Sequence, residues 1–498
     1  RADSGLAPVR NVRRRAHIQQ PVADQRGGGL PVSAFLPYAD GSVPAGTTAH
    51  ERRNIATEIP GWISENCIQC NRCSFVCPHA VIRPAVLTEE QLSLAPEGIR
   101  SLPLTGIDNR YFSIVISEVD CTGCGACAAA CPGRQGKKAL EMHPVQGGSP
   151  AAGISGDTLA QRCFDYAKRL PSQREAARRF GFNTLKGSQF LRPFLEFSGA
   201  CAGCGETPYV KLLTQLFGPE LYLANATGCS SIWANSSPSC AYCLDENGRG
   251  PAWSNSLFED AAEFGLGMVL AGEAARSPMT CWVIGGDGWA YDIGFGGLDH
   301  VLSTGKNINL LVLDTEVYSN TGGQVSKATP LGATAKFLSG GKKTRKKDLA
   351  AMAMTYGNVY VAQIAFGADP AQTVRALSEA AAYDGPSLVI AYATCIAHGI
   401  RAGLGSSAEE MKKAVDSGYF HLFRFHPLLK EQGKNPFVLD SKEPVLNYRD
   451  FLAGEIRYDS LRRDHPEQAE QLFQEAARQA GERYARLKRL ETFYAPET

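Results

Sequence analysis

Short apolar runs alternate with glycine-rich turns and helical stretches in residues 196–498. Three of these runs, at 281–285, 309–314 and 386–392, are mainly apolar and too short for helices. Strands that are buried on both faces have this composition, and they alternate with helices in parallel sheets. We therefore expect an α/β domain with a mainly parallel sheet. Its last part, 466–493, is charged with apolar residues at helical spacing, which predicts an amphipathic helix.

The preceding half of the chain has a different pattern. Residues 1–50 are rich in Gly, Pro, Ala and Arg with weak periodicity, as in a linker or the tail of a preceding domain. Residues 51–150 form a region of their own, in which an insertion at 88–110 precedes an alternating strand pattern at 111–119. Residues 151–195 look helical with basic faces, which predicts a solvated connector.

Composition narrows the class of protein. Sixteen cysteines in 498 residues, many of them in C-x-x-C spacings, indicate metal ligation in a reducing compartment, so we expect a cytoplasmic protein. The formal net charge of +1 gives no electrostatic case for nucleic-acid binding. The sequence contains no run of 18 or more apolar residues, so we predict no membrane span. The chain begins with Arg rather than Met, which we interpret as a fragment or a processed product.

Two groups of four cysteines share the spacing C-x-x-C-x-x-C-x-x-x-C-P. This is the signature of a domain with two [4Fe–4S] clusters, in which the fourth cysteine of each group ligates the other cluster. Repetition of the motif also predicts a pseudo-twofold domain. The ligands of one predicted cluster are Cys67, Cys70, Cys73 and Cys131. The ligands of the other are Cys121, Cys124, Cys127 and Cys77.

Zinc is the alternative for these cysteines, because four thiolates also suit tetrahedral Zn²⁺. Zinc sites usually pair two C-x-x-C segments and do not need the additional C-x-x-x-C-P. The spacing therefore favours iron–sulfur clusters. With the strand pattern between the two groups, it predicts a ferredoxin-like α+β domain over residues 51–150.

A second set of polar residues follows two of the predicted strands. Asp287 stands between Gly286 and Gly288, and a second turn supplies the hydroxyl of Thr315 and the carbonyl of Val317. Ligands of parallel sheets bind at the carboxyl ends of strands, and Mg²⁺ prefers hard oxygens together with phosphate oxygens. Glycines also let backbone N–H groups approach a diphosphate. The layout predicts a site for Mg²⁺ and thiamine diphosphate, although Gly-Asp-Gly alone is also an ordinary turn.

A further cysteine pair, Cys201 and Cys204, cannot hold a cluster without two more thiolates. Cys229 and Cys395 lie in predicted turns, where a thiolate can point into a site. Cys281 opens a buried strand, which is typical of a core thiol. The other candidates, which we interpret as structural or incidental thiols, are Cys163, Cys240 and Cys243. The residues alone do not decide which two of these cysteines would join Cys201 and Cys204.

Seven segments carry a resemblance to a known family: 57–62, 65–71, 196–206, 226–231, 285–292, 314–324 and 392–396. With them, the chain resembles the C-terminal half of the pyruvate:ferredoxin (flavodoxin) oxidoreductases. The resemblance runs from about Gly41 to the end, and residues 1–30 match poorly. It implies a ferredoxin-like two-cluster α+β domain followed by a thiamine-diphosphate-binding α/β domain.

The resemblance also implies roles for individual residues. It implies that a third [4Fe–4S] cluster has as ligands Cys201, Cys204, Cys229 and Cys395. It implies Mg²⁺ ligation by Asp287, Thr315 and the carbonyl of Val317. Asn320 corresponds to a residue near the diphosphate and substrate, and we predict that it is catalytic. The predicted cofactor-binding residues are Glu206, Cys229, Gly286, Asp287, Gly288, Trp289, Thr315 and Asn320.

The activity implied by the resemblance is oxidative decarboxylation of pyruvate with coenzyme A to acetyl-CoA and CO₂. Electrons would pass through three clusters to ferredoxin or flavodoxin, and the family suggests a homodimer. The family's pyrimidine-binding, coenzyme A and main substrate regions lie outside this chain, so we expect it to be inactive alone. The alternatives are another 2-oxoacid as substrate, or an electron-transfer protein with a decayed α/β domain. A non-redox thiamine decarboxylase would have no use for three clusters.

Two features close to these sites have competing interpretations. Residues 342–347 form the densest run of positive charge. We interpret this run as a solvated loop, in preference to a surface that steers an acidic carrier. His398 follows Cys395, and it either tunes the third cluster or is a core histidine with satisfied hydrogen bonds.

Overall fold

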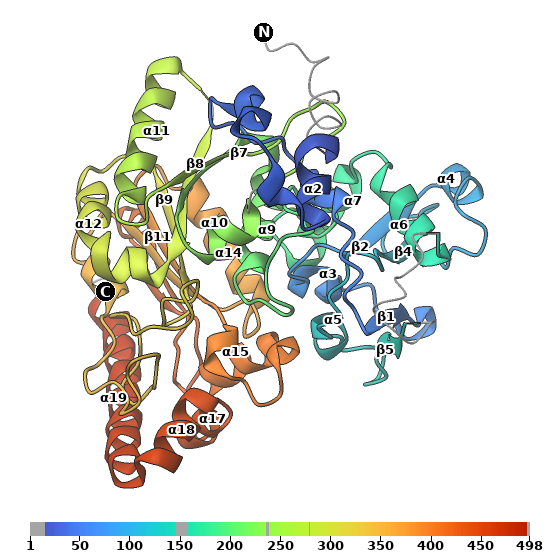
Figure 1. Cartoon of the computed structure of the whole chain (residues 1–498). Coiled ribbons are helices and arrows are strands. Elements are labelled where there is room, and N and C mark those ends of the chain that lie inside the picture. Colours follow the sequence, from blue (N-terminus) through green and yellow to red (C-terminus); the bar gives the residue numbers. More distant parts are fainter. Residues whose placement is uncertain (1–14, 146–156, 236–238, 278, 496–498) are drawn as a thin grey trace.

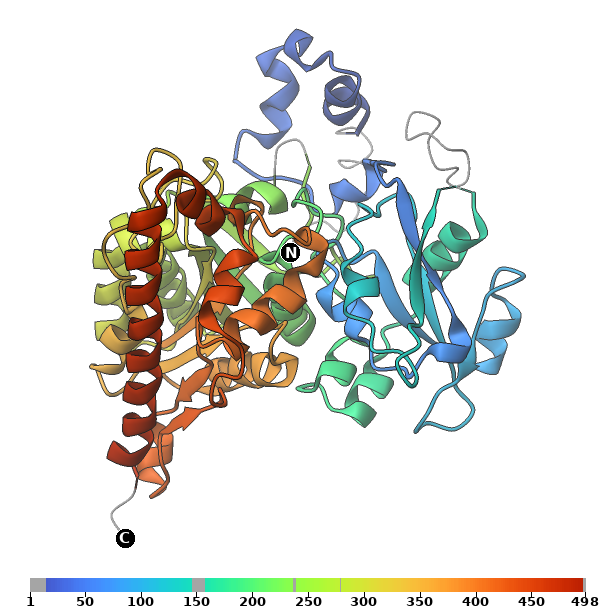
Figure 2. The same cartoon turned by 90° about the horizontal axis from the view of Figure 1, so that it is seen from below.

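The computed structural model describes residues 15–145, 157–235, 239–277 and 279–495. Two parts of the chain lie side by side, with the long C-terminal helix on the far side of the larger part (Figures 1 and 2). The described residues form three β-sheets, two small ones in the first part and a large one in the second. No helix within these residues is both long enough and apolar enough to cross a membrane.

Antiparallel strands frame the smaller part. Its three-stranded sheet has the order β2-β4-β3, and β1 pairs with β5 in a sheet of its own. The strands are β1 (Glu58–Trp62), β2 (Ile82–Leu87), β3 (Leu102–Pro103), β4 (Tyr111–Ile116) and β5 (Leu140–Pro144). The short helices between them are α3 (Arg72–Val76), α4 (Glu89–Ser93) and α5 (Ala126–Ala129). Each of α3 and α5 belongs to one of the two cysteine repeats.

The strand predicted at 111–119 is present as β4, but its predicted alternation is wrong. Every residue of β4 after Tyr111 is buried. The rings of Trp62 and Phe190 pack edge-on against Phe112, and helix α6 (Leu159–Lys168) packs on the strand. Both faces of β4 are therefore covered, so exposed positions do not alternate with buried ones.

The segment after β5 contributes to the same core. Its helices are α6, α7 (Arg174–Phe180) and α8 (Leu185–Ser188). Phe164 and Ala177 are fully buried among residues of β2 and β4, whereas Arg174 and Arg178 are exposed. The basic faces are solvated at Arg174 and Arg178, whereas Lys168 is half-buried and forms an ion pair with the buried Glu196, and the opposite faces complete the small domain.

Residues 15–56 form a strap of short helical turns. The turns are η1 (Arg15–Gln19), α2 (Gln20–Ala23), η2 (Gly27–Gly29), η3 (Val32–Tyr38) and η4 (Thr47–His50). The N–H of Gly46 donates to the Tyr242 carbonyl at 2.6 Å, and the N–H of Thr48 donates to the Cys240 carbonyl at 3.2 Å. The strap is thereby joined to the larger part of the chain.

A single large sheet organises the second part, in the order β13-β12-β10-β11-β9-β8-β6-β7. All its pairings are parallel except those of β12 and β13 at one edge, which confirms the predicted α/β architecture. The runs at 281–285, 309–314 and 386–392 are confirmed as β8, β9 and β11. The strands are β6 (Leu221–Ala226), β7 (Ala252–Ser256), β8 (Thr280–Gly286), β9 (Asn309–Asp314), β10 (Tyr360–Ile364), β11 (Ser387–Tyr392), β12 (Phe423–Phe425) and β13 (Phe437–Leu439).

Helices cover both faces of this sheet, and alternate residues of β9 show the two cores. Leu311 and Leu313 pack with α9, α10 and α14 on one face, while Leu310 and Val312 pack with α11, α12 and α13 on the other. The predicted helix at 466–493 is confirmed as α19. The helices are α9 (Thr207–Phe217), α10 (Cys229–Ala234), α11 (Ala261–Ala275), α12 (Phe295–Ser303), α13 (Leu349–Met354), α14 (Pro370–Ala382), α15 (Ser407–Asp416), α16 (Leu428–Glu431), α17 (Tyr448–Ala453), α18 (Ile456–Asp464) and α19 (Pro466–Phe493).

Candidate functional site

Two small cavities lie inside the domain of the cysteine repeats. The cysteines that line the first cavity are Cys67, Cys70, Cys73 and Cys131. Those that line the second are Cys77, Cys121, Cys124 and Cys127. Each cavity thus takes three cysteines from one repeat and the fourth from the other, which is the grouping that the spacing predicts. Within the described residues, no three His, Cys, Asp or Glu side chains are arranged to hold a single metal ion.

The same local bond recurs at the cysteine turns. The N–H of Gln69 donates to the sulfur of Cys67, and the N–H of Gly123 donates to the sulfur of Cys121, both at 3.4 Å. Burial raises the pKa of Cys121 to about 12, and it raises the pKa of Cys127 well above its usual value. Thiolates in these cavities therefore need positive charge from a bound metal, and the hydrogen bonds to sulfur suit an iron–sulfur cluster.

The third predicted cysteine set gathers at the edge of the large sheet. Cys201 and Cys204 precede α9, Cys229 begins α10, and Cys395 follows β11. Burial raises the pKa of Cys229, and the charges of Glu206, Cys395 and Cys204 raise it further. Burial also raises the pKa of Cys395 to about 12, and the charges of Glu206 and Cys201 raise it further, so the four cysteines lie near one another. The N–H groups of Glu206 and Ala397 donate to the sulfurs of Cys204 and Cys395, each at 3.4 Å.

The other cysteines lie away from these three groups. Cys281 donates to the carbonyl of Gly265 at 3.8 Å, and Cys243 donates to the carbonyl of Pro193 at 3.7 Å. Cys163 is buried in the core beside β4, and Cys240 donates to the carbonyl of Tyr242. All four are buried thiols, consistent with their interpretation as structural residues.

The predicted magnesium ligands converge at the ends of β8 and β9. Gly286 pairs with Leu313, so Asp287 and Thr315 follow neighbouring strands at one edge of the sheet. The hydroxyl of Thr315 lies 3.1 Å from Asp287 Oδ1 and 3.1 Å from the carbonyl oxygen of Val317. Burial raises the pKa of Asp287 well above its usual range, and the charge of Asp314 raises it further. A cation bound here would favour the ionised form of Asp287. The carboxylate of Asp287, the hydroxyl of Thr315 and the carbonyl of Val317 are oxygen ligands of the kind that Mg²⁺ prefers.

The remaining predicted cofactor residues divide into buried and exposed ones. Glu206 is buried and accepts a hydrogen bond from Trp233 Nε1 at 2.9 Å, and burial raises its pKa to about 7. Trp289 is buried, and a side chain at Gly288 would lie within 2.4 Å of the Tyr318 ring. Asn320 is exposed in the turn after Val317.

One contact missed in the sequence is the hydroxyl of Ser326, which donates to Asp287 Oδ2 at 2.5 Å. A serine in a loop 39 positions away carries no spacing signal for this role. His398 Nε2, assigned as the protonated nitrogen, donates to the Thr315 carbonyl at 2.7 Å. Its ring is completely buried. The histidine therefore supports the turn that bears the predicted magnesium ligands.

The interpretation of residues 342–347 as a solvated loop is confirmed for 343–345, which are exposed, but is wrong for Lys342 and Lys346. Lys342 is buried and donates to the carbonyls of Ser326 and Thr329 at 2.9 and 2.7 Å. Lys346 forms ion pairs with Asp314 at 2.6 Å and with Glu316 at 3.0 Å. These buried carboxylates behind the magnesium turn attract the lysines inward, and charge density alone did not reveal them.

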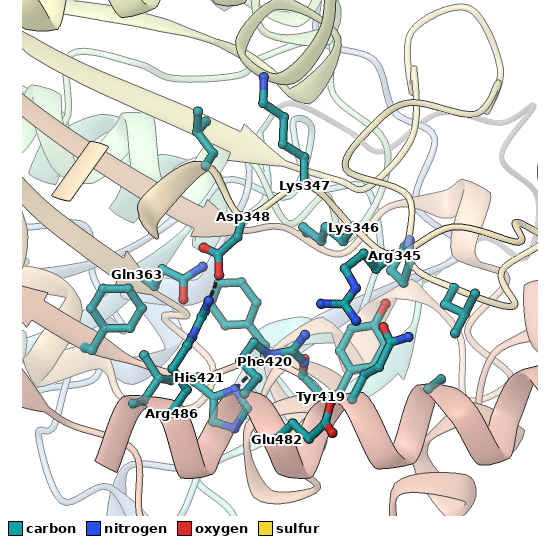
Figure 3. A pocket seen from close by; sticks show the side chains of 18 of the residues that line it. Arg345, Lys346, Lys347, Asp348, Gln363, Tyr419, Phe420, His421, Glu482 and Arg486 are labelled. Atoms are coloured by element: carbon teal, nitrogen blue, oxygen red, sulfur yellow. Dashed lines mark hydrogen bonds and ion pairs between the residues drawn. The ribbon is translucent and has the colours of Figure 1, made fainter. Parts of the chain in front are cut away.

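Behind this network lies a cavity of about 530 Å³. Figure 3 shows Arg345, Lys346 and Lys347 on one side and Glu482 and Arg486 of α19 on the other. Arg486 forms an ion pair with Asp348 across the opening. None of the residues predicted for the cofactors lines this cavity, but Glu316, between Thr315 and Val317 of the magnesium turn, does.

Comparisons with known families agree with this arrangement. Residues 66–135 match a family model described as a 4Fe-4S dicluster domain, and residues 226–391 match the C-terminal TPP-binding domain of thiamine pyrophosphate enzymes. Residues 16–56, which overlap most of the segment 1–50 that we interpreted as linker or tail, match a domain of unknown function. The chain therefore belongs to the class of proteins that combine a 4Fe-4S dicluster domain with a thiamine-pyrophosphate-binding domain. The dicluster match resolves the zinc alternative in favour of iron–sulfur.

Three relatives define the family. A pyruvate-flavodoxin oxidoreductase of Klebsiella pneumoniae is 48% identical over 95% of this chain and 45% of its own length. A pyruvate:ferredoxin oxidoreductase of Moorella thermoacetica is 47% identical over 95% of this chain and 45% of its own length. A mitochondrial pyruvate dehydrogenase [NADP(+)] of Euglena gracilis is 43% identical over 95% of this chain and 29% of its own length. The chain is a partial-length homologue of the pyruvate:ferredoxin/flavodoxin oxidoreductases, and it spans less than half the length of these relatives.

Proposed function

We propose that this chain is the electron-relay and diphosphate-binding part of an enzyme that oxidatively decarboxylates pyruvate with coenzyme A to acetyl-CoA and CO₂. Electrons would pass to ferredoxin or flavodoxin. The observation that carries the proposal is the contact between successive cysteine sets, which links the magnesium turn to the surface. A homodimer in the cytoplasm, and inactivity of this part alone, remain predictions.

The relay begins beside the magnesium turn. The hydroxyl of Ser319, which follows Val317 in that turn, donates to the sulfur of Cys229 at 3.2 Å. Mg²⁺ would be held by Asp287, Thr315 and the Val317 carbonyl, and thiamine diphosphate would supply an electron sink for decarboxylation. Asn320 would lie at the open side of the turn, toward the substrate. The third cysteine set would thus be the first electron acceptor, beside the bound cofactor.

The next contact joins the third cysteine set to the dicluster domain. Burial raises the pKa of the Cys124 thiol, and the backbone N–H groups of Ala126 and Gly203 lower it by hydrogen bonding. Gly203 lies between Cys201 and Cys204, and the segment of Leu404 and Gly405 packs closely against both Gly203 and Cys124, so it joins the two cysteine turns. Cys73 lies on α3 and Cys127 on α5, and these two helices pack together, so the two cavities of the dicluster domain lie beside each other. Ile68, beside the outer cavity, is 47% exposed, so electrons can leave there.

The first test is the iron and acid-labile sulfide content of anaerobically purified protein. Three cubes correspond to about twelve irons per chain. Cys229→Ala and Cys395→Ala should each lose about four irons. Cys281→Ala is the matched control, since it removes a buried thiol outside the three sets, and it should lose none. About eight irons in the unaltered protein would refute the third cluster.

The second test supplies the N-terminal region of a family member and measures ferredoxin reduction with pyruvate and coenzyme A. Activity that depends on pyruvate and is lost in Asp287→Asn supports the proposal. Equal or greater activity with 2-oxoglutarate would assign a different 2-oxoacid. Full iron content without binding of magnesium thiamine diphosphate would leave an electron-transfer protein.

A further inference from the structure

A lysine of the thiamine domain reaches into the dicluster domain. Lys211 lies on α9 and is only 2% exposed. Its ammonium donates to three carbonyl oxygens at the end of α3: that of Ser74, and those of Phe75 and Cys77, both at 3.0 Å. An ammonium group has three N–H donors, so all its donors are used. None of these partners is a carboxylate.

The charges that favour this buried cation are those of the cluster cysteines. Burial lowers the pKa of Lys211 to about 8, and the charges of Cys77 and Cys73 raise it against that effect. Cys77 belongs to one cavity and Cys73 to the other. A buried ammonium without a counter-charge costs several kcal/mol. Cubes with four thiolate ligands are negatively charged, and each gains one negative charge on reduction.

The second repeat has an equivalent lysine in a different environment. Lys138 donates to the carbonyls of Ala128 and Ala129 at 2.8 and 3.4 Å. These two residues occupy the same places after Cys127 that Ser74 and Phe75 occupy after Cys73. Lys138 comes from its own domain and is exposed, so water and salt screen its charge. The chain thus contains its own control for the effect of burial.

We propose that Lys211 is a positioning residue that raises the reduction potentials of the two clusters in the dicluster domain. It does so from the thiamine domain, so the potentials depend on the contact between the two domains. A fixed positive charge stabilises the reduced, more negative form of each cube, and low dielectric strengthens the effect. The inference rests on the dicluster part of the proposed function and does not require turnover of pyruvate.

The test is an EPR-monitored redox titration of the anaerobically purified chain, with dithionite supplying one electron to each cube. Lys211→Met should make reduction of at least one dicluster cube about tenfold less favourable, a shift of about 59 mV to more negative potential. Lys211→Gln, which keeps N–H donors without the charge, should shift it in the same direction. Lys211→Arg, which keeps the positive charge, should retain the native reduction potential. Lys138→Met should change the equilibrium by no more than about twofold.

The iron content of each variant distinguishes failure of the proposed function from failure of the role proposed for Lys211. Unaltered protein without dicluster iron would refute the proposed function itself. Lys211→Met and Lys211→Gln with full iron and unchanged potentials would overturn the electrostatic role. Loss of iron in both variants, with Lys211→Arg at full iron content and the native potential, would show that the lysine acts only as a structural support. An equal shift in Lys138→Met would show that burial and the domain contact are irrelevant.

Discussion

The two cysteine repeats share one spacing and one backbone shape, yet different residues support that shape. Each repeat is left-handed at two positions, at Gln69 and Asn71 in the first and at Gly123 and Gly125 in the second. Left-handed backbone costs an L-residue about 1–2 kcal/mol, and glycine avoids this cost. The second repeat therefore relies on glycine, whereas the first must stabilise two strained residues.

Side-chain hydrogen bonds provide that stabilisation. Gln69 Nε2 donates to the Pro103 carbonyl at 2.8 Å, and Gln69 Oε1 accepts from the N–H of Thr105 at 2.9 Å. Asn71 Nδ2 donates to the carbonyl of Lys186 on α8 at 3.0 Å. Together with Lys211, these side-chain bonds join the first repeat to its surroundings, whereas the second repeat meets the thiamine domain by close backbone packing at Cys124. Identical motifs can thus differ in which parts of the molecule hold them in place.

The largest test of this comparison asks whether a repeat or a cavity is the unit that binds iron. Cys77→Ala should lose about four irons, and adding Cys121→Ala should lose no more, because both cysteines line one cavity. Adding Cys67→Ala instead should lose about eight, although Cys67 and Cys77 belong to the same repeat. Iron and sulfide analysis of the two double variants measures this. If the variant with Cys121→Ala lost about eight irons and the variant with Cys67→Ala only about four, each repeat would bind its own cluster.

A smaller effect is expected from the glycines of the second repeat. An alanine Cβ at Gly123 would lie 2.9 Å from the Glu58 carbonyl oxygen, whereas one at Gly125 would have no neighbour within 4 Å. Gly123→Ala should therefore reduce the free energy of unfolding by about 3 kcal/mol, and Gly125→Ala by about 1 kcal/mol. Anaerobic denaturant titration followed by cluster absorbance measures both. Equal losses would show that the contact with β1 does not constrain the turn.

The smallest effect is expected at Gln69. Gln69→Ala keeps the left-handed strain and loses two hydrogen bonds, so it should cost about 2 kcal/mol. Gln69→Gly loses the same bonds but relieves the strain, so it should cost about 1 kcal/mol. The same denaturant titration compares the two variants. A larger loss in Gln69→Gly would mean that strain is unimportant in the first repeat.

Much of this architecture follows from local sequence, and the failures have physical causes. The strands β8, β9 and β11 are continuous apolar runs, and the cysteine spacing groups eight thiols correctly round two cavities. Cys229 and Cys395 come from separate elements, so only the family resemblance selected them. The burial of Lys342 and Lys346 depends on acceptors distant in sequence. Lys211 gave no signal, because its partners lie in another domain.

The glycines at the junction of the two domains have a kinetic consequence. An alanine Cβ at Gly405 would lie 2.0 Å from the Cys124 carbonyl oxygen, and one at Gly203 would lie 2.5 Å from the carbonyl oxygen of Leu404. No bulkier residue fits without moving the two cysteine turns apart. Electron tunnelling slows exponentially with separation. In the proposed relay, a hydrogen atom in place of a side chain at each of these two glycines would therefore shorten the time that an electron spends in the thiamine domain.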